Sequence, residues 1–156
     1  MATQNYEPAR YGSGPYRVVH YQESAGESFQ KGQFVKLDTS GQLTACVDDD
    51  QVILGMALAD ASGTQGNEIP VVLAQDGTGF IMNVYHATPA SAVSAVNQLD
   101  GEYNLEVDSN RCYVDIGNTA LAALQPMRLV DAAGDLRGRV EAVVLPAAQQ
   151  LGAAAS

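Results

Sequence analysis

Short apolar runs of strand length, each followed by turn residues such as Asp, Gly and Ser, recur along most of the chain. Runs of this length between turn residues predict β-strands, and the pair on either side of the 38–41 turn predicts a hairpin. The sequence therefore predicts a mainly β fold, a barrel or sandwich of short strands built from hairpins. The first six runs lie at residues 17–21, 34–37, 42–46, 51–59, 68–74 and 80–85.

The pattern changes at Thr88, where a threonine suited to an N-cap is followed by Pro89 and an alanine-rich stretch. This combination predicts a short helix that ends before Asp100. Two further hairpins are expected, 103–107 with 111–116 and 126–130 with 138–145, with a helical turn at 119–124 between them. We expect four parts: an extended N-terminal arm (1–16), a first β lobe (17–87), a helix with a second β lobe (88–146) and a flexible tail (147–156).

The N-terminal arm has a composition of its own. Four of the seven tyrosines recur every five residues from Tyr6 to Tyr21, three of them in the arm, and this spacing fits neither a helix nor a strand. Tyrosine and arginine are enriched at binding hot spots, so the arm is expected to bind a partner. A floppy tail, or tyrosines folded back on their own domain, are the alternatives. The candidate partner-binding residues are Tyr6, Arg10, Tyr11, Tyr16 and Arg17.

The charge of the chain limits the partners it could have. Eighteen acidic and eight basic residues give a net charge of −10, which repels nucleic acid and anionic membranes. The acidity serves either solubility alone or a charge-matched partner surface. The sequence has no run long enough to span a bilayer and no signal-peptide pattern at its start, so synthesis in the cytoplasm is expected. Cys46 and Cys112 lie far apart in apolar contexts, which favours buried thiols over a disulfide.

The residues that could carry catalysis are sparse. The two histidines, His20 and His86, have no sequence motif around them that pairs them with a nucleophile, and no phosphate-binding glycine motif occurs. The aspartates at 48–50 are the best metal candidates, but adjacent side chains point in different directions, so a solvated turn is expected instead. The chain is therefore expected not to be an enzyme, and no cofactor or metal is expected.

One stretch resembles a known family. Residues 25–38 combine Gly26-Glu27 with Gly32 and a following apolar strand, the 38–41 turn forms a hairpin, and Gly55 lies inside the next apolar run. This pattern resembles that of phage capsid cement (head-decoration) proteins over about residues 17–86. The resemblance implies a β-rich, often trimeric protein that binds the major capsid protein on the outer face of the virion.

Two other functions stay open at this stage. One is a head appendage that binds host surface glycans, although few aromatic residues follow Tyr21 to stack on sugars. The other is a trimeric enzyme with sites at subunit interfaces, as in dUTPases, although the C-terminal tail lacks phosphate-binding polar residues. A lipoyl- or biotinyl-carrier domain is not favoured, because neither Lys31 nor Lys36 lies at an exposed hairpin tip.

Overall fold

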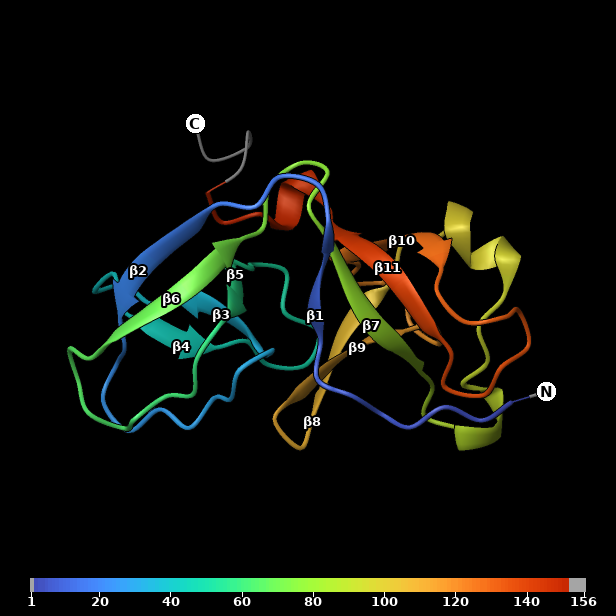
Figure 1. The fold of residues 1–156 in the computed structure, drawn as a ribbon, viewed down its shortest axis with the longest axis horizontal. Helices are drawn as coiled ribbons and strands as arrows, with labels where there is room; N and C mark the ends of the chain where they lie inside the picture. Colours follow the sequence, from blue (N-terminus) through green and yellow to red (C-terminus); the bar gives the residue numbers. More distant parts are fainter. Residues whose placement is uncertain (1, 152–156) are drawn as a thin grey trace.

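The computed structural model describes residues 2–151 and consists of two β-sheets, between which the chain passes after β1 and again after β6 (Figure 1). The predicted mainly β fold is confirmed, with the two sheets packed in the manner of a sandwich. Within the described residues, no helix is long and apolar enough to cross a membrane.

The five-stranded sheet is antiparallel and has the order β2-β6-β5-β3-β4. A single parallel bridge between Glu23, just after β2, and Leu43 in β4 draws its two edges together, so the sheet curls. Each of its strands lies in or overlaps a predicted run. The strands are β2 (Val18–Gln22), β3 (Phe34–Leu37), β4 (Leu43–Ala45), β5 (Gly55–Ala57) and β6 (Glu68–Leu73).

The other sheet has six strands, with the order β10-β11-β7-β9-β8 and with β1 paired to β7. Strand β7 is the centre of this sheet: its first half pairs with β1, its second half pairs with β9, and β11 occupies its other edge. The strands are β1 (Arg10–Ser13), β7 (Gly79–Tyr85), β8 (Asn104–Asp108), β9 (Arg111–Asp115), β10 (Leu124–Leu129) and β11 (Arg139–Val144).

The hairpin between β8 and β9 forms where the sequence predicts it. Ser109 and Asn110 have φ angles of 51° and 61°, so both lie in the left-handed region. Two such residues make a turn whose twist matches that of the flanking strands. The turn fixes the register that places Asp108 opposite Arg111.

Alternation along the strands divides the apolar residues between two cores. Phe34, Met56 and Val72 point from the five-stranded sheet toward Phe80 and Met82 of the other sheet, and together they form the larger core. Their chain neighbours point to the opposite face, into a second core enclosed by the curled sheet, because successive strand residues face opposite sides. This second core contains Phe29, Val35, Leu43, Leu54, Ala57, Ile69, Val71 and Leu73.

The two expected helical segments differ from the prediction. The stretch from Thr88 to Asp100 forms two 3-10 turns, at Pro89–Ser91 and Val96–Asp100, in place of one helix. The residues between them pair with residues 134–137: Val93 forms a bridge with Leu136, and Arg137 donates its N–H to the carbonyl of Ala92. Residues 119–124 form a simple turn that leads directly into β10.

The boundaries of the expected parts also shift. Strand β7 lies within the expected first lobe (17–87), but it pairs only within the six-stranded sheet. The tail was expected to be flexible from residue 147, yet Ala148 and Gln149 are buried and Ile53 donates its N–H to the Ala148 carbonyl at 2.8 Å. A 3-10 turn at Pro146–Ala148 starts this segment. Residues 152–156 of the expected tail lie outside the described residues.

Candidate partner-binding surface

The N-terminal segment crosses the outer face of the six-stranded sheet and then joins it as β1 (Figure 1). Asn83 of β7 holds it: the N–H of Glu7 donates to Oδ1 at 2.8 Å, and Nδ2 donates to the Asn5 carbonyl at 3.0 Å. Arg111 donates from Nη1 to the Tyr6 carbonyl at 2.9 Å. This part of the extended segment therefore folds back on its own domain, as in one of the alternatives, and supplies hydrogen bonds to the buried side chain of Asn83.

Tyr6 lies inside a cluster of rings rather than on a free surface. Its ring centroid is 4.5 Å from that of Tyr113 and 6.4 Å from that of Tyr85, and the Arg137 guanidinium lies 5.0 Å from the centre of its ring. Burial raises the pKa of Tyr6, and the nearby Arg137 charge opposes this shift. Because these rings face one another, Tyr6 contributes to packing and offers little ring face for stacking on a sugar.

Tyr11 and Tyr16, in contrast, lie together at the end of β1, where Tyr11 is half-buried against the larger core and Tyr16 is exposed. Their ring centroids are 4.7 Å apart in an edge-on arrangement, and the Tyr11 hydroxyl donates to the Gly14 carbonyl. The Tyr16 side chain is 55% exposed. Arg10 and Arg17 are also exposed, so three of the five candidate residues, Arg10, Tyr16 and Arg17, stay open to a partner.

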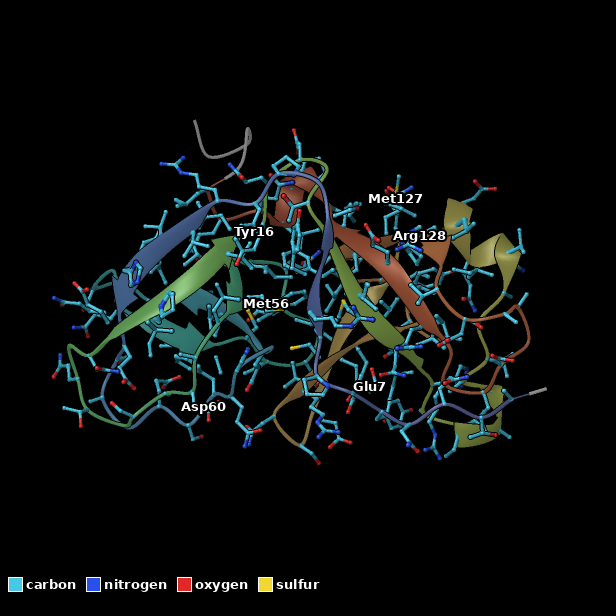
Figure 2. All side chains as sticks on the ribbon, in the orientation of Figure 1. Glu7, Tyr16, Met56, Asp60, Met127 and Arg128 are labelled. Carbon is cyan, nitrogen blue, oxygen red and sulfur yellow. The ribbon has the colours of Figure 1, made fainter. Side chains whose placement is uncertain are left out.

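The buried Glu141 carboxylate connects this end of β1 to strand β10. Ser13 donates its hydroxyl to one carboxylate oxygen, and Arg128 donates to the other from Nε at 2.9 Å. A β-bulge between Pro126 and Arg128 turns Met127 outward, where it is 54% exposed. Figure 2 shows Tyr16, Met127 and Arg128 in the same upper part of the molecule. We call Arg10, Tyr16, Met127 and Arg128 the β1–β10 surface.

Met127 and Arg128 were not among the residues that the sequence singles out. Their exposure depends on the bulge, which shifts the register of β10 against β11. The one available signal is Pro126 within an apolar run, because proline in a strand is typical of an edge or a bulge.

A groove lies beside β1, between the N-terminal segment and the five-stranded sheet. Its volume is about 480 Å³, within the usual range of ligand pockets. Pro8, Ala9, Met56 and Leu58 make its walls largely apolar. We call it the β1 groove; its lining is completed by Glu7, Arg10, Tyr11, Lys31 and Gly32.

The three consecutive aspartates each bind a different part of the molecule. Asp48 accepts the N–H of Val107, Asp49 accepts Nδ2 of Asn104 at 2.9 Å, and Asp50 pairs with Lys36 at 2.6 Å. These contacts fasten the loop to β8 and β3. Within residues 2–151, no group of three His, Cys, Asp or Glu side chains is arranged to hold a metal ion.

The histidines and cysteines have structural surroundings. His20 is exposed on β2, and Nδ1 of His86 accepts the N–H of Thr88 at 2.9 Å. Cys46 and Cys112 are buried free thiols in the larger core and form no disulfide, as predicted. Burial raises the pKa of Cys112 to about 12 and that of Cys46 well above its ordinary value, so neither supplies a thiolate at neutral pH.

No protein-family model matches the chain, and no curated protein matches it. The β1–β10 surface and the β1 groove are therefore the features from which a function can be argued.

Proposed function

We propose that the protein is a phage capsid decoration (cement) protein. In this proposal it binds the outer surface of an assembled head as a homotrimer and stabilises contacts between major capsid protein subunits. The cement-like pattern across about residues 17–86 supports the proposal, and so does a body made of two sheets of short strands.

The observation that carries the proposal is the β1–β10 surface. Tyr, Met and Arg are the residue types enriched at protein interfaces, and this surface exposes one Tyr, one Met and two of the six arginines of the chain. The rest of the molecule is strongly acidic, with a net charge of −10 for the whole chain. An acidic body keeps the free protein soluble, while the exposed aromatic and cationic side chains supply contacts with a protein lattice.

Weak contacts are sufficient for this function. A protein that binds only the assembled lattice stabilises that lattice by mass action. Several copies of the surface, held together in one trimer, would add their contacts by avidity.

The experiment is co-sedimentation of the purified protein with empty heads assembled from a major capsid protein that the same genome encodes. We expect the double variant Tyr16→Ala/Met127→Ala to bind at least about 10-fold more weakly than the wild type. The matched control is Val47→Ala/Val96→Ala, which removes side chains that are 59% and 64% exposed elsewhere. Thermal unfolding of each variant verifies that it is folded.

Equal losses of binding in the two double variants would contradict the role of the β1–β10 surface. Absence of wild-type binding to the heads would contradict the decoration function itself. The native mass in solution tests the homotrimer separately.

A further inference from the structure

Strand β1 has one edge without a strand partner among residues 2–151. It pairs with β7 only, through Arg10 opposite Ile81 and Tyr11 opposite Phe80. In an antiparallel pair, every second residue directs its N–H and C=O away from the partner strand. Outside the ladder with β7, no backbone hydrogen bond from residues 10–13 is formed within the described part of the chain.

The β1 groove separates this strand from the five-stranded sheet. Met56 of β5 and Leu58 form the far wall, and both edges of β5 are already paired, with β3 and β6. At one end of the groove, Gly32 packs directly against the N-terminal segment, because a Cβ there would lie 2.6 Å from the Ala9 carbonyl oxygen. This contact limits the width of the groove at that end. The groove thus combines apolar walls with the strand that retains unpaired backbone groups.

Two exposed cations, Arg10 and Lys31, lie on the rim of the groove and make no ion pair within residues 2–151. The one acidic residue in the lining, Glu7, contacts Arg139 at 3.5 Å. Asp60 accepts the backbone N–H of Lys31 at 2.8 Å, so one further carboxylate lies near this rim. The rim therefore offers two unpaired cationic side chains in a protein whose net charge is −10.

We propose that the β1 groove binds an extended acidic peptide segment of a partner protein, which adds to β1 as a further antiparallel or parallel strand. The backbone of the segment pairs with the open edge of β1, as in other cases of strand addition. Its alternate apolar side chains enter the groove toward Met56 and Leu58, while its carboxylates meet Arg10 and Lys31.

The open edge of β1 has a competing explanation, which is that the strand is built to avoid pairing with other chains. Strand β1 is short, carries a charged side chain and has an irregular register between Tyr11 and Ser13, and all three features prevent unwanted pairing. Edge protection alone, however, does not account for an apolar groove of about 480 Å³ beside the strand. The inference does not depend on capsid binding, because the groove can be tested with a peptide alone.

The probe is a fluorescein-labelled octapeptide that alternates valine with aspartate or glutamate, measured by fluorescence anisotropy with the full-length protein. The first comparison peptide has lysine at every acidic position. The second keeps the acidic sequence but has N-methyl groups on alternate backbone nitrogens, which removes strand hydrogen bonds without changing the side chains. We expect saturable, salt-sensitive binding of the acidic peptide alone, and slower hydrogen exchange at residues 10–13 when it is bound.

Charge-reversal variants locate the site. We expect Arg10→Glu and Lys31→Glu each to weaken binding by about 5-fold or more, because each replaces an attraction with a repulsion. The matched control Arg17→Glu makes the same change of charge on an exposed arginine outside the groove, and we expect less than about a 2-fold effect. Equal weakening by all three variants, equal binding of the N-methylated peptide, or no saturable binding at millimolar peptide would each overturn the proposal.

Discussion

The five-stranded sheet takes all of its strands from residues 18–73, whereas the six-stranded sheet combines β1, at residues 10–13, with strands that begin at residue 79. The first sheet satisfies its buried carboxylate locally. Glu23 accepts the N–H groups of Ser62 and Gly63 at 2.9 and 3.0 Å, and Asn67 donates to it at 2.9 Å. These partners all lie in the loop before β6.

The six-stranded sheet satisfies its buried polar residues through the distant N-terminal segment. Asn83 binds Asn5 and Glu7, and Glu141 binds Ser13. Both candidate binding features also include residues of β1. The comparison indicates that the buried carboxylate beside the five-stranded sheet finds its partners within residues 18–73, while Asn83 and Glu141 of the six-stranded sheet depend on the distant N-terminal segment, which also contributes to both candidate binding features.

Deletion of residues 1–13 is the strongest way to break this comparison. The deletion removes β1 and leaves Asn83 and Glu141 buried without several of their partners, which is costly. We expect a loss of about 4 kcal/mol or more in the free energy of unfolding. Hydrogen exchange should show the largest loss of protection in β7 and β11, and a smaller one in β3 and β6. Tyr16→Ala, which retains β1, is the control; equal loss in both sheets would contradict the division.

Two buried phenylalanines, one in each core, allow the two cores to be tested separately. Phe34 packs edge-on against Phe80 of the other sheet, with centroids 5.2 Å apart, whereas Phe29 lies in the core within the curled sheet. We expect Phe34→Ala and Phe29→Ala each to cost about 3–5 kcal/mol, with Phe34→Ala higher because it also loses an aromatic pair. Urea unfolding measures both. Phe34→Ala should reduce exchange protection in both sheets, and Phe29→Ala mainly in one; the reverse pattern would contradict the assignment of the cores.

Gly32 tests the contact between the five-stranded sheet and the N-terminal segment. Its φ is +90°, and a Cβ would approach the Ala9 carbonyl oxygen to 2.6 Å. We expect Gly32→Ala to cost about 2–3 kcal/mol, from backbone strain together with this clash. Gly26→Ala is the matched control, because Gly26 has a φ of +74° with nothing within 4 Å of an added Cβ. Equal costs in thermal unfolding would show that the contact with Ala9 contributes nothing.

The sequence predicts the strands better than it predicts their partners. Residues 34–37 form a strand with the predicted bounds, because alternation and the following turn are local signals. Nothing local indicates that β7 pairs with β1, β9 and β11, since pairing depends on which distant strands share the core. The helix expected from Thr88 to before Asp100 is divided into two 3-10 turns for a similar reason: its proline and alanine residues suit a helix, but backbone pairing of the residues between the turns with residues 134–137 interrupts it.

The candidate surface was predictable only in part. Tyr and Arg enrichment pointed to the N-terminal segment, but composition alone could not separate Tyr6, which packs against other rings, from Tyr16, which is exposed. The β1 groove was not predictable at all, because it forms where segments far apart in the sequence meet.

The two sheets should also differ in their response to pH. Burial acts to raise the pKa of Glu23, but its hydrogen bonds from Ser62, Asn67 and Gly63 hold that pKa below the ordinary value of 4.5. Its contribution to stability is therefore present above about pH 4.5 and is lost as the pH falls through the lower, folded pKa. In the six-stranded sheet, burial and the nearby Asp48 and Asp115 raise the pKa of Glu106 to about 7.

For Glu106 the pH dependence has the opposite sign. Its carboxyl group holds a proton more tightly in the folded protein than in the unfolded chain. The contribution of Glu106 to stability is therefore greatest below about pH 4.5 and falls as the pH rises through about 7. Glu106→Gln, which resembles the protonated acid, should raise the midpoint of thermal unfolding by about 1–3 °C at pH 8 and leave it nearly unchanged at pH 5; partial exposure keeps this effect small. Glu23→Gln is the contrast and should lower the midpoint at pH 8. A stabilisation by Glu106→Gln that is equal at both pH values would mean that the carboxylate charge is not its cause.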